Sequence, residues 1–90
     1  MIPQFTQDPS DVLDYTFDWV AWLGSDTIAQ SEWSSSVTDI QIFTESNTTT
    51  TATGWVGGGN VGDRALISNK ITTTGGRTVE RSFTLRIKNQ

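Results

Sequence analysis

The last third of the chain contains two runs with apolar residues at every second position, residues 64–73 and 77–88. Alternation of this kind predicts β-strands, because successive side chains of a strand point to opposite faces. Only three residues separate the runs, and two of them are glycine, so the strands are expected to form an antiparallel hairpin. This hairpin constrains the fold most strongly, since a sheet with one apolar face needs a second layer to cover it.

The register of this hairpin follows from matching side chains across it. A three-residue loop places Ile71 opposite Val79, whereas a two-residue loop places it opposite Glu80. The three-residue loop also pairs Lys70 with Glu80, and apolar and oppositely charged cross-strand pairs both stabilise a sheet. Gly76 then occupies the loop position that requires a left-handed backbone, where glycine is favoured.

The same register directs Arg81 to the inner face of the sheet, beside Phe83 and opposite Asn69. A buried arginine needs an acidic partner or backbone carbonyls. Asp14, Asp18 and backbone carbonyls are the candidate partners. The alternative is that the side chain reaches solvent at the edge of the domain.

The rest of the chain favours the same fold class. Threonine accounts for 15 of the 90 residues, and valine and isoleucine together for 13, a composition that suits strands. Short strands with frequent turns predict an antiparallel, immunoglobulin-like β-sandwich of six or seven strands, with a small barrel as the alternative. Besides the hairpin, strands are expected over residues 12–23, 27–34, 37–44 and 48–56.

Two details refine these strands. Ile28 and Trp33 are five residues apart and fall on opposite faces, which predicts a bulge between them. Residues 20–23 are alternatively a short helical turn.

The four tryptophans separate into two pairs. Trp19 and Trp33 match the inner positions of their strands and are expected in the core. Trp22 and Trp55 fall opposite their apolar neighbours or near turns, and large exposed aromatic side chains are frequent interface anchors. Core packing and carbohydrate binding are the alternatives for this second pair.

Residues 1–10 are predicted to be an extended N-terminal arm, with a single sandwich domain over residues 11–90. The segment contains two prolines and is polar apart from Ile2 and Phe5. Because these two side chains cannot form a core of their own, we expect the arm to be disordered in the isolated chain. In an assembly it would lie against another chain.

Charge is divided unevenly along the sequence. Residues 1–63 contain nine acidic and no basic residues, whereas residues 64–90 contain all six basic residues and one acid. One interpretation is that neighbouring strands neutralise each other within the domain. The other is a dipolar subunit that docks head to tail in a symmetric assembly of several copies, with Arg77 and Arg86 at the contact.

Several function classes are disfavoured. The chain has no cysteine or histidine, which excludes the usual zinc ligands and histidine-based triads. The pattern Gly57-Gly58-Gly59-Asn60-Val61-Gly62 resembles a dinucleotide-binding turn, but a period-2 segment follows it instead of a helix. The acidic residues at positions 8, 11, 14 and 18 lack the spacing of a calcium loop. We therefore expect no enzyme activity, cofactor or metal.

The chain is also not expected to bind nucleic acid or a membrane. It is acidic overall and has no apolar run long enough to span a bilayer. No signal peptide is recognisable, so synthesis in the cytoplasm is expected.

An ordered series of motifs extends along residues 8–87. The motifs are Asp8-Pro9, Val12-Leu13-Asp14-Tyr15, Asp18-Trp19, Trp22-Leu23, Asp26-Thr27-Ile28, Trp33, Trp55-Val56 with the glycine-rich segment, Ile71-Thr72-Thr73, Gly76-Arg77-Thr78 and Arg81-Ser82-Phe83-Thr84-Leu85. Together they resemble a family of small tailed-bacteriophage virion proteins, the phage fibre-tail adaptors with an immunoglobulin-like sandwich.

The resemblance implies a structural, non-enzymatic role in the virion of a tailed phage. The protein would link the tail or neck to receptor-binding fibres through contacts with other virion proteins, after synthesis in the host cytoplasm. The alternative is a module that decorates the capsid or binds a host-surface glycan.

Overall fold

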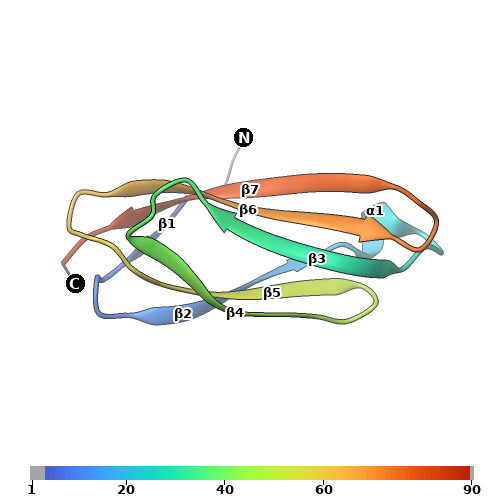
Figure 1. The fold of residues 1–90 in the computed structure, drawn as a ribbon, viewed down its shortest axis with the longest axis horizontal. Helices are drawn as coiled ribbons and strands as arrows, with labels where there is room; N and C mark the ends of the chain where they lie inside the picture. Colours follow the sequence, from blue (N-terminus) through green and yellow to red (C-terminus); the bar gives the residue numbers. More distant parts are fainter. Residues whose placement is uncertain (1–3, 90) are drawn as a thin grey trace.

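The computed structural model describes residues 4–89, which form two β-sheets packed face to face (Figure 1). One sheet has the strand order β1-β7-β6-β3 and the other the order β2-β5-β4. The expected all-β sandwich is confirmed. Its elements are β1 (Gln4–Gln7), β2 (Val12–Asp18), α1 (Val20–Leu23), β3 (Ile28–Ser35), β4 (Ile40–Asn47), β5 (Thr51–Gly58), β6 (Arg64–Thr73) and β7 (Thr78–Ile87).

The hairpin of β6 and β7 has the register that the sequence predicts. Ile71 lies opposite Val79 and Lys70 lies opposite Glu80. Gly76 has φ +89°, a region that a residue with a side chain adopts only at a cost. The three-residue loop is therefore correct, and it fixes which face of both strands enters the core.

The strand expected over residues 12–23 ends at Asp18, and its last part is the helical turn α1. The carboxylate of Asp18 accepts a hydrogen bond from the backbone N–H of Val20 (3.0 Å). The N–H of Leu23 donates to the carbonyl of Trp19 (2.9 Å), which closes the turn. Trp19 thereby remains inside the sandwich while the chain changes direction.

The bulge expected between Ile28 and Trp33 is present, because the pairing of β3 with β6 shifts register between Ile28 and Gln30. The next two strands begin and end about three residues later than predicted. The Thr48 side chain accepts hydrogen bonds from the backbone N–H groups of Thr50 and Thr51. The threonine run therefore begins as a turn, and only its end belongs to β5.

The core lies between the two sheets and is rich in aromatic rings. The indole N–H of Trp19 donates to Asn69 Oδ1 (3.0 Å), so this buried polar pair is satisfied. A Cβ on Gly54 would approach Trp33 to within 2.6 Å, which explains a glycine in the middle of β5. The buried apolar residues are Trp19, Leu23, Ile28, Trp33, Ile40, Ala52, Val56, Ala65, Ile67, Ile71, Phe83, Leu85 and Ile87.

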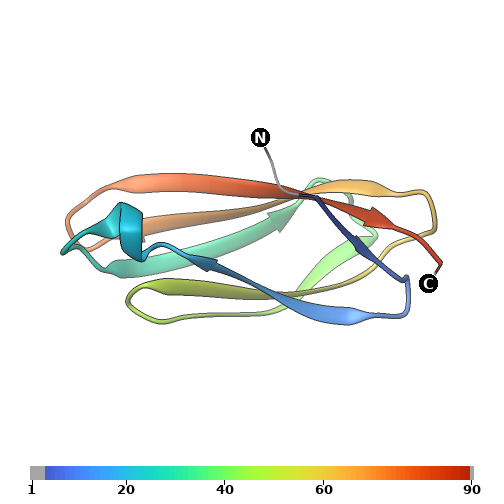
Figure 2. The same ribbon diagram turned by 180° about the vertical axis from the view of Figure 1, so that it is seen from behind.

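The N-terminal segment differs from the expectation of a separate arm. Gln4–Gln7 form β1, which pairs in parallel with the end of β7, and Phe5 lies opposite Leu85. Figure 2 shows how the chain crosses from β1 in one sheet to β2 in the other. Residues 4–7 are thus part of the sandwich, and residues 1–3 lie outside the described part of the chain.

Gln7 explains why this short polar segment is bound to the domain. Its side chain is fully buried, and its amide donates to the backbone carbonyls of Val56 (2.8 Å) and Asp11 (3.1 Å). The hydroxyl of Tyr15 donates to Gln7 Oε1 (2.7 Å). Burial and the nearby charge of Asp11 raise the pKa of Tyr15 above its usual value, so the hydroxyl stays protonated and keeps this bond at neutral pH.

Arg81 has the predicted orientation but a different partner. It lies opposite Asn69, and its guanidinium carbon is 4.4 Å from the centroid of the Trp19 ring. Within residues 4–89 no acid or backbone carbonyl bonds to it, so the suggested partners are wrong and the alternative, a side chain that reaches solvent at the edge of the domain, is the one observed. The side chain is exposed, so a cation–π contact at the open edge accommodates the charge.

The substitution Gly76→Val tests the loop geometry. A β-branched residue at a positive φ should destabilise the domain by about 1–2 kcal/mol. Chemical denaturation measures this loss, with Thr78→Val as a matched control that introduces the same side chain at an exposed strand position. Equal midpoints for the two variants would contradict the assigned loop.

Candidate protein interaction surface

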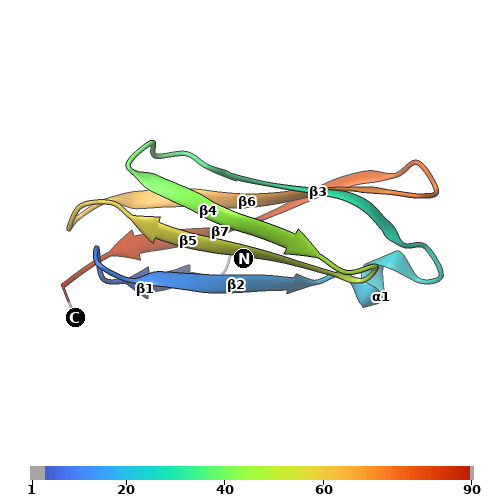
Figure 3. The same cartoon turned by 60° about the horizontal axis from the view of Figure 1, so that its bottom comes forward.

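One end of the molecule is held by an ionic contact between the loop after α1 and the β6–β7 hairpin, which lie at the same end in Figure 3. Arg77 forms an ion pair with Asp26 (3.1 Å) and donates to the carbonyl of Leu23 (3.0 Å). Its guanidinium carbon also lies 4.2 Å from the centroid of the Trp22 ring. We call Asp26, Arg77 and Trp22 the clasp. Its side chains are engaged within the domain.

Asp26 receives many hydrogen bonds for an aspartate in a loop. Hydrogen bonding from the Thr73 hydroxyl, from the backbone N–H groups of Thr27 and Gly75 and from the Thr74 hydroxyl holds the pKa of Asp26 far below its usual value. Burial acts in the opposite direction but is outweighed. The carboxylate is therefore charged at neutral pH and joins two loops that are distant in sequence.

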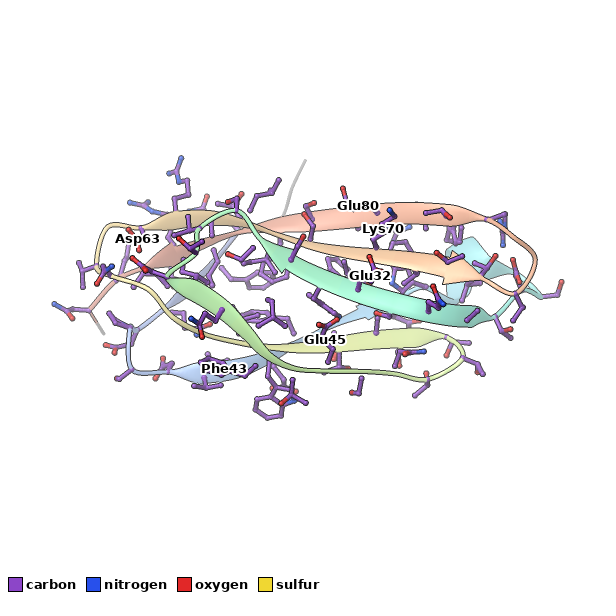
Figure 4. The ribbon with its side chains drawn as sticks, viewed as in Figure 1. Glu32, Phe43, Glu45, Asp63, Lys70 and Glu80 are labelled. Atoms are coloured by element: carbon purple, nitrogen blue, oxygen red, sulfur yellow. The ribbon has the colours of Figure 1, made fainter. Side chains whose placement is uncertain are left out.

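The outer face of the β2–β5–β4 sheet presents an apolar surface. Phe43 is 56% exposed, Val12 is 47% exposed and Trp55 is 40% exposed. A Cβ on Gly57 would lie 2.8 Å from both Phe43 and Val12, so these two side chains meet over the glycine. We call Val12, Phe43 and Trp55 the outer patch, and Figure 4 shows Phe43 on the side that faces away from the other sheet.

The geometry of β4 and β5 produces this patch. Ile42 pairs with Val56 on the inner face, and the next pair is Thr44 with Trp55, so Phe43 occupies a bulge. The bulge directs Phe43 outward beside Trp55. A cluster of exposed aromatic and aliphatic side chains is typical of a contact surface for another protein.

The two sheets differ in charge. Strands β2, β4 and β5 contain three acidic and no basic residues. Strands β1, β3, β6 and β7 contain four basic and two acidic residues. The acids Glu32 and Glu80 flank Lys70 on the outer face (Figure 4), so part of this charge is balanced locally.

Two arginines on the outer face of the β1-β7-β6-β3 sheet are not balanced in this way. Arg64 lies directly opposite Arg86 across β6 and β7. The part of the chain that the structure describes gives neither of them an ion pair. Like charges opposite one another destabilise a sheet, so the pair is not explained by the stability of the domain. Leu66 is exposed next to Arg64 on the same face.

The structure separates the interface residues that the sequence suggested. Trp55 lies in the outer patch, and Arg86 lies opposite Arg64. Phe5 is exposed but packs against Tyr15 and Phe83. Trp22 and Arg77 belong to the clasp. A charge reversal at Arg77 would place a second carboxylate beside Asp26 and disturb the domain itself. Ile2 lies outside the described residues.

Sequence reasoning did not assign Val12, Phe43 or Arg64 to a surface. A signal for Phe43 was present, because it has the opposite parity to Ile40 and Ile42. In a strand with a buried face this parity indicates an outward side chain.

Among residues 4–89, no three side chains of the metal-binding types gather into a group that could hold an ion. The glycine-rich segment 57–62 ends β5 and turns into β6, so the strand-to-helix context of a dinucleotide site is missing there. In the same residues, no helix has the length and apolar character needed to cross a bilayer.

These features define a class: a small β-sandwich with an exposed apolar cluster on one sheet and a pair of facing arginines on the other. A comparison with protein families matches residues 7–86 to the family described as podophage GP4 fiber-tail adaptor protein gp77. The chain therefore belongs to this family of fibre-tail adaptors, which confirms the resemblance seen in its motifs. A tail adaptor is a structural component of the virion. A comparison with individually curated proteins gave no match.

The lowered pKa of Asp26 predicts a pH-dependent contribution to stability. Since the folded pKa lies below the unfolded value of about 3.9, the stabilisation is complete above that pH and is lost as the pH falls toward the folded pKa. Asp26→Asn should therefore lower the thermal midpoint at pH 7, and its difference from the parent should shrink below about pH 4. Thermal denaturation at several pH values measures this.

Asp14→Asn is the matched control, because Asp14 lies exposed on the outer face of β2. Its midpoint should follow that of the parent at every pH. If the difference between Asp26→Asn and the parent stays constant down to acidic pH, the carboxylate charge does not hold the clasp.

Proposed function

We propose that this chain joins the tail or neck of a podophage particle to its fibres, acting through contacts with other virion proteins and without catalysis. The outer patch is the observation that carries this proposal. Val12, Phe43 and Trp55 expose apolar area that the domain does not use for its own core. Membership of a fibre-tail adaptor family supports tail and fibre proteins as the partners.

An adaptor has to contact at least two neighbours, and the two sheets give it two different surfaces. The outer patch lies on the acidic β2–β5–β4 sheet, whereas Arg64, Arg86 and Leu66 lie on the outer face of the opposite sheet. Apolar anchors provide affinity, and charge provides orientation and rate of association. Opposite charge on the two sheets also supports head-to-tail contact between several copies in a symmetric assembly.

Substitution of the two aromatic anchors tests the outer patch. Phe43→Thr and Trp55→Thr keep a good strand residue at each position, so the fold should be retained. Each change should weaken docking by about 2 kcal/mol, roughly thirtyfold. The measurement is the amount of the chain in purified particles, after a phage that lacks it is complemented with each variant.

An isosteric pair of substitutions provides the control. Val12 in the patch and Val61 in the loop before β6 are both about half exposed, so Val12→Thr and Val61→Thr make the same chemical change. Only Val12→Thr should reduce incorporation. Normal incorporation of the patch variants, with loss of binding to host cells, would instead support a host-surface adhesion module.

The arginine pair gives a second test of the proposed function. Arg64→Gln with Arg86→Gln removes like-charge repulsion, so stability should stay constant or rise by a few tenths of a kcal/mol. Incorporation should nevertheless fall, and docking of the parent should weaken as salt is raised above about 0.15 M. The variant Lys70→Gln, whose charge is balanced by Glu32 and Glu80, is the control. Full incorporation of the double variant would show that the pair contacts no partner.

A further inference from the structure

One lateral side of the sandwich is open. In the part of the chain that the structure describes, β1 pairs with β7 only from Thr84 to Ile87, so the stretch from Thr78 to Phe83 has no strand beside its outer edge. On the other sheet β2 is an edge strand. These two edges face each other, because Phe83 contacts Tyr15 and Arg81 covers Trp19. We call the space between the two edges the lateral groove.

The groove contains a cavity of about 280 Å³. Aromatic rings form much of its wall. The centroid of the Phe83 ring lies 4.8 Å from that of the Tyr15 ring and 6.0 Å from that of the Phe17 ring. A space of this size and lining accepts an apolar side chain. The lining residues are Phe5, Asp14, Tyr15, Thr16, Phe17 and Phe83.

Strand β1 shows how an extended segment fits this side of the domain. Phe5 contacts Tyr15 and Phe83 although it is 43% exposed, and Gln7 lies two residues further on the same face. The Phe5 ring packs edge-on against Phe83 at 5.2 Å, and Gln7 is fully buried. A further strand in line with β1 would place its own alternate side chains in the cavity beside Phe5.

The backbone of β7 is oriented to receive such a strand. The N–H of Lys88 donates toward β1, to the carbonyl of Gln7 (2.9 Å), whereas the N–H of Ile87 donates to Asp63 on the other side (2.9 Å). Because these directions alternate along a strand, the even-numbered residues direct their backbone groups toward the line of β1. Glu80 and Ser82 therefore present donors and acceptors to the groove.

The charge of Arg81 limits which added strand could fit the lateral groove. It is exposed at the groove, stacks on Trp19 and has no ion pair within the described residues. An inward-pointing charge can protect an edge from aggregation by excluding an apolar strand. The same charge would bind a strand that places a carboxylate opposite it.

We propose that the lateral groove binds an extended segment of another protein as an added strand in line with β1. The segment has apolar side chains at alternate positions and one acidic side chain that faces Arg81. Main-chain hydrogen bonds provide affinity, and the cavity and Arg81 provide selectivity. Only the origin of the segment, a second virion protein, rests on the proposed function.

The probe is a capped synthetic peptide, Thr-Phe-Thr-Asp-Thr-Phe-Thr, added to the full chain. Amide hydrogen exchange and calorimetry measure its binding. Exchange of the Glu80 and Ser82 amides should slow about tenfold at saturation. Exchange of the Val79 and Arg81 amides, which face β6, should not change. The same peptide with alternate backbone amides methylated should not bind, because it cannot pair with an edge.

Two variants test selectivity. Arg81→Glu should weaken binding of the aspartate peptide about tenfold, and a peptide with lysine in place of the aspartate should restore it. Glu80→Pro removes a backbone donor that faces the groove, whereas Glu80→Thr keeps it. Only the proline variant should lose the peptide. Thermal denaturation confirms that each variant is folded.

The proposal is overturned if the methylated peptide binds equally well, or if the charge exchange restores nothing. It is also overturned if the peptide binds only a variant that lacks residues 1–3, since the groove would then belong to the chain's own N-terminus. Binding to both forms supports it. If the peptide does not bind, but Phe43→Thr still reduces the amount of the chain in particles, the added strand is ruled out and the proposed function stands.

Discussion

The buried hydrogen bond between Trp19 and Asn69 joins the end of β2 in one sheet to β6 in the other. Both side chains are fully buried, and the amide of Asn69 also donates to the Ser31 hydroxyl and the Glu32 carbonyl. Without these bonds the buried polar atoms would oppose folding. The network therefore fixes the end of β2 against β6 and β3. The other features of this end follow from it, because Arg81 stacks on the Trp19 ring and Trp22 packs against its edge.

Because the interior and one end are fixed in this way, the outer faces are available for the contacts that we propose. The clasp engages Arg77 and Trp22 in contacts within the domain, although Arg77 stays exposed and Trp22 is only partly buried. The outer patch and the arginine pair remain on opposite sheets, and neither contributes to the core. Substitutions in either surface should therefore leave the packing between the two sheets intact.

Local patterns in the sequence predicted the parts of the fold that depend on neighbouring residues. The β6–β7 register, the positive φ of Gly76 and the bulge after Ile28 all follow from period-2 alternation and turn chemistry. Strand β1 could not be found in this way, because four polar-rich residues have no period and their partner is at the other end of the chain. Of the residues in the outer patch and the arginine pair, the sequence suggested only Trp55 and Arg86 as interface candidates. The contact of Arg77 could not be predicted, because it depends on Asp26 lying beside the hairpin.

The proposed function requires that the two sheets contact different neighbours in the particle. Electron microscopy of the intact particle, at a resolution that shows side chains, tests it most directly. We expect density from a neighbouring protein over Phe43 and Trp55, and density from a different neighbour or a second copy over Arg64 and Arg86. A particle in which both surfaces face solvent, while the chain is held elsewhere, would contradict it.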